Sequence, residues 1–463
     1  MNMFTKILVA CSVFALAACD SDNNNNGDDD TEFSTIQVFH GSSDAPAVNV
    51  YVDGGLALSG VDYLQSSPFI GVEAGTHEIR VDGILPGGDV TVLGPVDLTF
   101  GADTIYTISA INGVANIEAS VIEQPDVPVA GGAARVFVLH ATPGPVAPDF
   151  SLPVDVYVTV PGGALDSPLP FDFRGTIGPV ELAAGDYQIR VFLSGSTDGA
   201  DLVYDSGTIT LNDGDDLRLA AVPSTVPQTI VGSGALTLAG LTPTGSVTLF
   251  DARTPAGLRL GHLSPDTGAV DVVVDQAVYA GGVAFPTVTG FAPLPPTTYN
   301  VAIQAAGMPG VVPIGPVDLT LDAGTWYSVL AVNYFNDIEP LILTDDPRPV
   351  TTNAKVRVIH AAPTAQTVDV YVVPVDPMME TDITNIDPTL PGFAFRDNTG
   401  YLALPEGDYD VIVTGVGAKD PAIGPAQISI ANGGVYTAIA RDPMPDSMDF
   451  GLIVLADMLN EDT

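Results

Sequence analysis

Apolar and polar residues alternate over short segments of this chain, from about residue 35 almost to its end. Alternation with a period of two predicts strands with one buried face, because successive side chains of a strand point to opposite sides of a sheet. Almost no segment shows sustained helical periodicity, and 48 Gly and 39 Pro residues supply turns. The pattern therefore predicts an all-β protein.

One order of strands occurs four times. A short strand ends in a histidine, a turn rich in Pro, Ser, Asp or Gly follows, and a Val-rich strand comes next. Each copy then continues with an alternating strand, two strands around a Gly-containing turn, and a last short strand. Seven or so short strands in roughly 100 residues are typical of a β-sandwich. The four repeated histidines are His40, His140, His262 and His360.

We expect four tandem immunoglobulin-like antiparallel β-sandwich domains after a signal peptide and a disordered tether. The only tryptophan is Trp326 and the repeats hold no cysteine, which excludes the antibody type with its disulfide packed on a tryptophan. The predicted boundaries are 1–18 for the signal peptide, 19–34 for the acidic tether, and 35–124, 132–252, 256–346 and 353–460 for the four sandwiches.

The spacing of the repeats indicates a duplicated pair. His262 follows His40 by 222 residues, and His360 follows His140 by 220. Copies two and four also share an insertion that copies one and three lack. The insertion carries Phe171, Phe173 and Arg174 in copy two, and Phe393, Phe395 and Arg396 in copy four. An A–B pair that became A–B–A–B explains both observations, and we expect four stacked or beaded domains.

The N-terminus predicts export. Lys6 precedes an apolar stretch too short to span a bilayer comfortably, and the stretch ends in Leu16-Ala-Ala-Cys19. This motif resembles the lipobox of bacterial lipoproteins, which implies acylation of Cys19 and a membrane anchor in the cell envelope. An ordinary signal peptide that contains a cysteine is the alternative. Asp20 resembles an inner-membrane retention signal of enteric-type sorting, but the choice of membrane stays open.

The repeats themselves resemble a bacterial envelope family, domain of unknown function 4397. The likeness rests on the histidine, the Ser-Pro-Asp turn that ends at Asp266, and the Val-Asp-Val-Tyr-Val strands. It covers nearly all of the chain after residue 35, although copy two has a longer turn and copy three lacks the strand tyrosine. The resemblance implies tandem β-rich modules on exported, often lipid-anchored proteins, and it carries no activity.

The charge of the chain limits its partners. Its 56 acidic and 14 basic residues give a net charge of −42, which repels nucleic acid and anionic headgroups. Such a surface suits solubility in salty surroundings, and collection of Ca²⁺ is the alternative. The Asp- and Asn-rich tract 20–30 matches the opening of an EF-hand loop, but Phe33 occupies the position that requires Glu. We therefore assign no metal site, and Ca²⁺ is the one cofactor left open.

The repeated histidines invite a chemical interpretation. His262 and His360 are each followed nine residues later by a carboxylate, Asp271 and Asp369, and such a pair could orient a base or hold a metal. Strand parity argues against this, because each histidine shares its face with apolar residues while the aspartate lies on the opposite face. We expect a buried histidine that fixes its turn through a backbone hydrogen bond.

The scarce arginines recur in pairs. Arg80 and Arg190 occupy one strand position, Arg259 and Arg357 another, and Arg174 and Arg396 the insertions. Surface salt bridges of small net value are the simplest role. A guanidinium beside the two phenylalanines of each insertion could instead grip a sugar or a peptide, which makes these six insertion residues the candidate ligand site.

The sequence holds no Gly-x-Ser-x-Gly, His-Glu-x-x-His, Cys-x-x-Cys or phosphate-loop motif. We assign no catalytic residue and predict a lipid-anchored, non-catalytic array with a structural, adhesive or ligand-binding role toward a protein or glycan. Two alternatives stay open: an envelope enzyme of unknown type that acts on surface glycans, and a Ca²⁺-dependent adhesin. Four similar copies suit avidity better than a single catalytic centre.

Overall fold

The computed structural model describes residues 31–142, 153–225, 236–308 and 310–458. The predicted signal peptide, the lipidation residue Cys19, Asp20 and the 20–30 tract lie outside these residues. Nearly all regular structure in the described part is β, in eight sheets of four or five strands. No helix among these residues is long and apolar enough to cross a membrane. The all-β prediction is confirmed.

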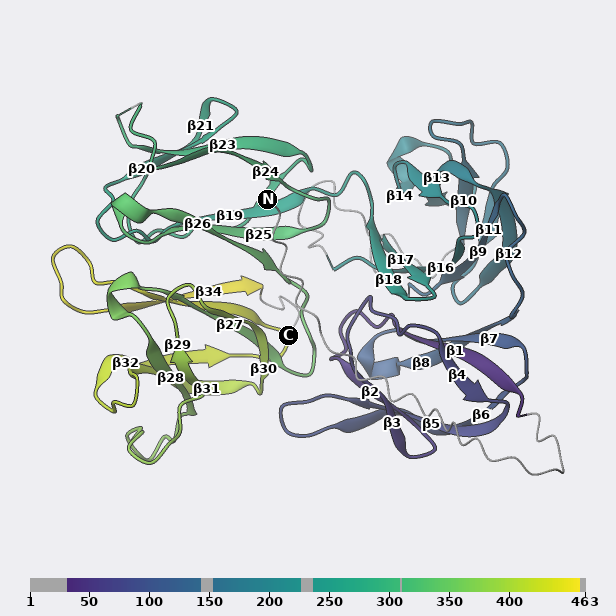
Figure 1. Cartoon of the computed structure of the whole chain (residues 1–463), viewed down its shortest axis with the longest axis horizontal. Coiled ribbons are helices and arrows are strands. Elements are labelled where there is room, and N and C mark those ends of the chain that lie inside the picture. The colour runs from purple at the N-terminus through teal and green to yellow at the C-terminus, as the bar shows by residue number, and fades with distance from the viewer. Residues whose placement is uncertain (1–30, 143–152, 226–235, 309, 459–463) are drawn as a thin grey trace, which may run out of the picture. The chain divides into compact units, whose positions relative to one another are not determined.

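The first and third repeats share one arrangement of two four-stranded sheets (Figure 1). In the first repeat, β4-β1-β7-β8 faces β3-β2-β5-β6, and in the third, β22-β19-β25-β26 faces β21-β20-β23-β24. The elements of the first are β1 (Phe33–His40), β2 (Val48–Val52), β3 (Gly55–Val61), β4 (Ile70–Glu73), β5 (Gly75–Gly83), β6 (Val90–Phe100), β7 (Thr104–Ile111), η1 (Val114–Asn116) and β8 (Glu118–Pro125). Those of the third are β19 (Ala256–His262), β20 (Val270–Val274), β21 (Ala277–Val283), β22 (Ala292–Leu294), β23 (Thr298–Ala305), β24 (Ile314–Thr320), β25 (Trp326–Val332), η3 (Phe335–Asp337) and β26 (Glu339–Asp345).

The second and fourth repeats follow the same plan. The second extends one sheet to five strands, β12-β9-β16-β17-β18, and builds the other from β11-β10-β13-β14, with β15 also paired to β13. The fourth has sheets β30-β27-β33-β34 and β29-β28-β31-β32. The elements of the second are β9 (Ala133–His140), β10 (Val154–Thr159), β11 (Leu169–Phe171), β12 (Thr176–Ala183), β13 (Gly185–Leu193), η2 (Gly199–Asp201), β14 (Leu202–Asp205), β15 (Ile209–Leu211), β16 (Asp216–Pro223), β17 (Leu236–Thr242) and β18 (Gly245–Phe250). Those of the fourth are β27 (Ala354–Ala361), η4 (Pro363–Ala365), β28 (Val368–Pro374), β29 (Leu390–Phe393), β30 (Asn398–Leu404), β31 (Gly407–Gly415), β32 (Pro421–Ile430), β33 (Val435–Arg441) and β34 (Gly451–Met458).

The antiparallel sandwich predicted from the sequence is confirmed, with one parallel pair in each repeat. The first strand of a repeat runs parallel to the strand near its end, as β1 does to β7 and β27 to β33. The same holds for β9 with β16 and β19 with β25. Alternation of side chains gives no information on this direction, because parallel and antiparallel strands share the period of two.

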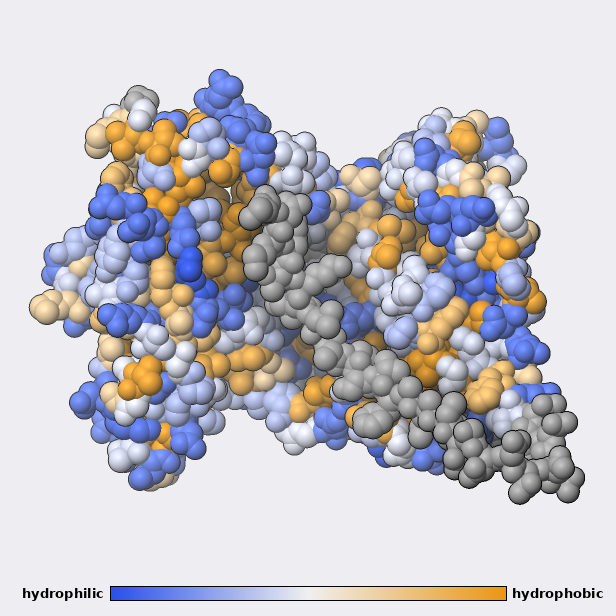
Figure 2. Space-filling view, in the orientation of Figure 1, coloured by the Kyte–Doolittle hydropathy of each residue, from blue (hydrophilic) through white to orange (hydrophobic). Residues whose placement is uncertain are grey.

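Each sandwich encloses its own apolar core. Inward side chains of both sheets meet there, such as Val136, Val156 and Leu219 in the second repeat and Val356 and Val411 in the fourth. Fully burying an aliphatic side chain of this kind contributes about 1.5–3 kcal/mol. The face in Figure 2 mixes hydrophilic and hydrophobic residues, as expected of sheets with one side buried.

The chain folds into two compact units, one for each A–B pair of the proposed duplication. The first holds β1 to β17 with most of β18, and the second holds β19 to β34. Within each unit a further apolar cluster joins the two repeats. It includes Phe39, Phe137 and Leu139 in the first unit, and Leu330 and Ile359 in the second. Strands such as β27 are therefore buried on both faces, and the repeats of a unit are packed together, not strung as beads.

Candidate functional site

The repeated histidines lie at the end of the first strand of each repeat, where they hold the following turn. His40 is fully buried, and its Nε2 lies 2.9 Å from the carbonyl oxygen of Pro46. Its Nδ1 accepts a hydrogen bond from the backbone N–H of Ser42 at 3.3 Å. Because Nδ1 accepts, Nε2 carries the proton and donates to the carbonyl. His360 makes the same pair of contacts, with its Nε2 2.7 Å from the oxygen of Gln366.

His140 differs from the other three. Its Nδ1 accepts from the N–H of Thr142 at 3.4 Å, but its Nε2 has no hydrogen-bond partner among the described residues. In the third repeat, by contrast, Nε2 of His262 lies 2.9 Å from the oxygen of Gly268. Burial lowers the pKa of His140 to about 4, and burial also lowers the pKa of His360. Both imidazoles are therefore neutral at pH 7.

The aspartates that follow the histidines bind turns on the other side of the sheet. Asp369 accepts hydrogen bonds from the N–H groups of Gly392 and Gly417, both at 2.8 Å. Asp271 likewise accepts from Gly282 at 2.7 Å. Asp369 lies on the strand face opposite to the core, as strand parity predicts, yet it is only 5% exposed because these turns cover it. Within the described residues, no group of His, Cys, Asp or Glu side chains is arranged to hold a metal ion.

The insertion of the second repeat packs against its own histidine and against the first repeat. Phe171 is buried in the core, with its ring 5.5 Å from that of His140, and the ring of Phe173 lies 6.0 Å from the same histidine. Arg174 forms a two-pronged ion pair with Glu118 of β8, at 2.6 and 2.9 Å. Its own backbone N–H bonds to the carbonyl of His140.

The fourth repeat repeats this arrangement. The rings of Phe393 and Phe395 each lie 6.3 Å from the ring of His360. Arg396 donates to Glu339 of β26 at 2.7 Å. The insertions thus bridge the two repeats of each unit, and the six residues proposed from sequence as a ligand site have partners within the protein.

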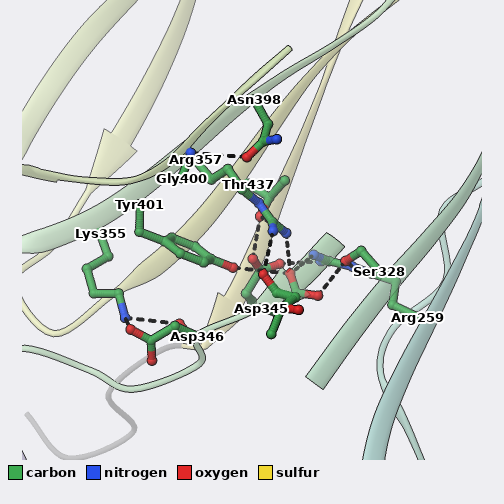
Figure 3. A network of polar contacts seen from close by, with 12 residues as sticks. Arg259, Ser328, Asp345, Asp346, Lys355, Arg357, Asn398, Gly400, Tyr401 and Thr437 are labelled. Carbon is green, nitrogen blue, oxygen red and sulfur yellow. Dashed lines mark hydrogen bonds and ion pairs between the residues drawn. The ribbon is translucent and has the colours of Figure 1, made fainter. Parts of the chain in front are cut away.

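The expectation of surface salt bridges is wrong for Arg259 and Arg357. Both lie in a buried network between the third and fourth repeats (Figure 3). Arg259 of β19 donates to Asp345 of β26 at 3.2 Å and to Asp457 of β34. Arg357 of β27 also pairs with Asp345, and the hydroxyl of Tyr401 donates to the same carboxylate at 3.2 Å. Two arginines and two aspartates balance in charge, and their ion pairs cross from one repeat to the other.

The first unit has a smaller network at its own junction. Asp216 accepts from Arg135 at 2.7 Å, from Arg218 at 3.2 Å, and from Gln124 of the first repeat at 3.2 Å. Burial alone would raise the pKa of Asp216, but the hydrogen bond from Arg135 and the charges of both arginines outweigh it and leave that pKa below its usual value. Sequence reasoning missed Asp216, Asp345 and Asp457, although a carboxylate inside an apolar strand is a signal that could have revealed them.

The remaining paired arginines bind locally. Arg80 lies 3.1 Å from Asp82, and its guanidinium stands over the ring of Tyr51. Arg190 donates to Thr159 and to the carbonyl of Gly163. These contacts match the salt-bridge and packing roles that a scarce cation finds on an acidic protein.

An apolar cavity of about 250 Å³ lies between the two sheets of the second repeat. Its lining comes from both sheets, and His140, Ser167 and Tyr187 are the lining residues whose side chains carry polar atoms. The hydroxyl of Tyr187 already donates to the carbonyl of Ala183. The corresponding space in the third repeat, beside His262, measures about 40 Å³. The second repeat is therefore hollow where the third is nearly filled.

Comparison with known proteins identifies one family. The family model described as Domain of unknown function (DUF4397) matches residues 34–152 and 256–371, which together make up half of the chain. These two regions begin in the first and third repeats, the A members of the two pairs. No curated protein matches the chain.

Solved structures give weak likenesses. The Bacillus anthracis TIE protein is 10% identical, with 89% of this chain and 68% of that chain covered and a TM-score of 0.15. A leucine-rich repeat protein from Bacteroides thetaiotaomicron VPI-5482 is 14% identical, with 42% and 27% covered and a TM-score of 0.12. At these TM-scores neither structure informs the fold or the function of this chain.

Proposed function

On the premise that this chain belongs to the domain-of-unknown-function family DUF4397, we propose that it is a lipid-anchored, non-catalytic protein of the bacterial cell envelope. Its two sandwich pairs would act as rigid spacers or display units, anchored through Cys19. The proposal rests on one observation: the polar residues that recur in the repeats bind the protein's own turns and neighbouring repeats.

A chemical site that occurred in every repeat would be built from the residues that every repeat shares. Those residues are the histidine of all four repeats and the aspartate of the next strand in three of them, since the first repeat has Asn49 at that position. In the described residues these histidines and aspartates bind turns of their own repeat. The arginines of the insertions and of the buried network in the second unit join one repeat to the next. Polar residues that recur in both halves of the duplication and bind only the protein itself favour a structural role over a catalytic one.

Anchoring is supported by the Leu16-Ala-Ala-Cys19 motif and by the cysteine content. Cys11 lies in the predicted signal peptide, so Cys19 would be the single cysteine of the mature chain. A lone thiol in an oxidising compartment is reactive, and acylation removes that reactivity. Each buried methylene adds about 0.8 kcal/mol, so several acyl chains on one residue hold a protein firmly at a membrane.

The test is to express the chain in a bacterium and to compare it with Cys19→Ser and Cys11→Ser. We expect the parent chain and Cys11→Ser to fractionate with membranes and to carry an acylated cysteine at the mature N-terminus by mass spectrometry. Cys19→Ser should lose the acyl mass and leave the membrane fraction. Membrane association of Cys19→Ser equal to that of the parent would overturn the anchoring proposal.

A further inference from the structure

We propose that the second repeat binds a medium-chain acyl compound. Its chain would fill the apolar cavity between the two sheets, and its carbonyl oxygen would accept a hydrogen bond from Nε2 of His140. The proposal rests on three observations: the volume and chemistry of the cavity, the unpartnered nitrogen of a buried histidine, and the contrast with the other repeats.

The size of the cavity sets the size of the ligand. An engineered cavity of about 150 Å³ in a protein core holds one benzene molecule. A cavity of about 250 Å³ has room in proportion for an apolar body of about ten non-hydrogen atoms, the size of octanoic acid. Its walls are mainly aliphatic, with Val156, Ile189, Leu219 and Leu238 among them. They suit a flexible chain better than a polar molecule.

One hydrogen-bond donor of the cavity lining has no partner in the part of the chain that the structure describes. His140 is 1% exposed, and its Nε2 is bonded to none of the described residues. Since Nδ1 accepts from Thr142, Nε2 carries the proton and requires an acceptor. A buried donor without a partner costs free energy, and a ligand oxygen at this point would remove that cost. The group needed is therefore a carbonyl or carboxyl oxygen at one end of the apolar chain.

The other three repeats supply the acceptor themselves, and the third also nearly fills the space. In repeats one, three and four, a carbonyl of the following turn accepts from the histidine Nε2. Those turns place the next Val-rich strand eight residues after the histidine, whereas Val154 follows His140 by fourteen. The third repeat keeps only about 40 Å³ at the same place. Among the described residues, the second repeat thus has neither an acceptor for this nitrogen nor side chains that fill the space.

The cavity also has an entrance. Leu169 and Ser167 line it, and both are exposed, Leu169 by 38%. A ligand could enter beside β11 without unfolding the sandwich. A carboxylate and a neutral ester present the same oxygen to His140, so a free fatty acid and an esterified acyl chain are the two sources of one chemistry.

The proposal is tested by calorimetric titration of the full chain carrying Cys19→Ser, so that no acyl group of its own competes. The probes are octanoic acid, methyl octanoate, octane and acetate. We expect saturable one-to-one binding of octanoic acid or methyl octanoate, binding of octane about five- to tenfold weaker because it lacks the hydrogen bond, and none of acetate. Tighter binding of the acid points to a free fatty acid, and tighter binding of the ester to an esterified chain.

Three variants locate the site. Ala221→Leu places three more carbon atoms in the cavity and should abolish binding, while Ala331→Leu, at the paired position beside His262 in the third repeat, should leave it unchanged. His140→Phe should keep the binding of octane and weaken that of methyl octanoate about five- to tenfold.

A measurement without these substitutions guards against a misfolded variant. Methyl NMR of the Cys19→Ser chain should show shifts on adding octanoic acid at Ala221 and Leu169, and none at Ala331. Absence of saturable binding by every probe, or shifts spread over both units, would overturn the proposal. So would equal affinity of octane and methyl octanoate together with full binding by Ala221→Leu.

Discussion

The carboxylate of Asp345 holds two arginines, one from each repeat of the second unit, and Asp345→Asn removes its charge while keeping its size. The side chains of Asp345, Arg259 and Arg357 are 1%, 3% and 2% exposed, so water cannot replace the lost charge. Removing one member of a buried ion pair costs about 3–5 kcal/mol. The amide oxygen still accepts one hydrogen bond, so we expect a loss at the lower end, about 3 kcal/mol.

The only tryptophan makes this loss measurable in the second unit alone. Trp326 lies on β25 and is 4% exposed, so its fluorescence reports the unfolding of the unit that contains Asp345. For a urea dependence of about 3 kcal/mol per molar, a loss of about 3 kcal/mol lowers the unfolding midpoint by about 1 M.

The control at the same junction is Glu339→Gln. Glu339 pairs with Arg396 across the same two repeats, but the two side chains are 37% and 52% exposed. Exposed ion pairs contribute about 0–1 kcal/mol, so this midpoint should move by about 0.3 M or less. Equal shifts for the two variants, or a shift below about 0.3 M for Asp345→Asn, would refute the claim that the buried network holds the repeats together.

Three further predictions concern the whole chain and the first unit. Burial lowers the pKa of His140 to about 4, so as the pH falls this histidine is protonated in the unfolded chain before it is protonated in the folded chain. The folded state therefore loses stability progressively from about pH 6.5 down to about pH 4, by about 3 kcal/mol in all, and none above that range. Calorimetry at several pH values should show this fall in the stability of the first unit, and His140→Phe should remove most of the pH dependence. An equally steep pH dependence in the variant would contradict the assignment. Phe39→Ala opens the junction of the first unit and should cost about 3–5 kcal/mol, whereas a loss below about 1 kcal/mol in urea titration would show that the repeats do not depend on this contact. The net charge of −42 predicts that melting temperature rises with NaCl, and a flat response up to about 0.5 M would exclude self-repulsion as a large term.

The strands and the all-β class could be predicted because they depend on local information. The apolar residues before each histidine and the Val-rich strand after it fix two strands with a turn between them. Strand parity also separated His360 from Asp369, because the histidine shares its face with the apolar residues of its own strand, whereas the aspartate lies opposite the valine face of the next strand.

The junctions between repeats could not be predicted, because they depend on which faces meet. Phe39 and Ile359 lie on strand faces opposite to their histidines, and a second apolar face is equally compatible with an exposed surface. Arg259 and Arg357 looked like surface cations for the same reason. The partners of Arg259, Asp345 and Asp457, are 86 and 198 residues away in sequence, and Asp345, the partner of Arg357, belongs to the preceding repeat. The hollow core of the second repeat is likewise a property of three-dimensional packing, although the longer turn after His140 was visible.

The parallel pairing of the first strand of each repeat has a consequence for the order of synthesis. Thr35 of β1 pairs with Ile105 of β7, seventy residues later in the chain. Until those later residues have left the ribosome, β1 can make only its antiparallel contacts with β4, and the sheet lacks a central strand. Each sandwich therefore closes late, in one step that waits for nearly the whole repeat. Under the export proposed above, such a delay would keep the chain unfolded for longer before it crosses a membrane.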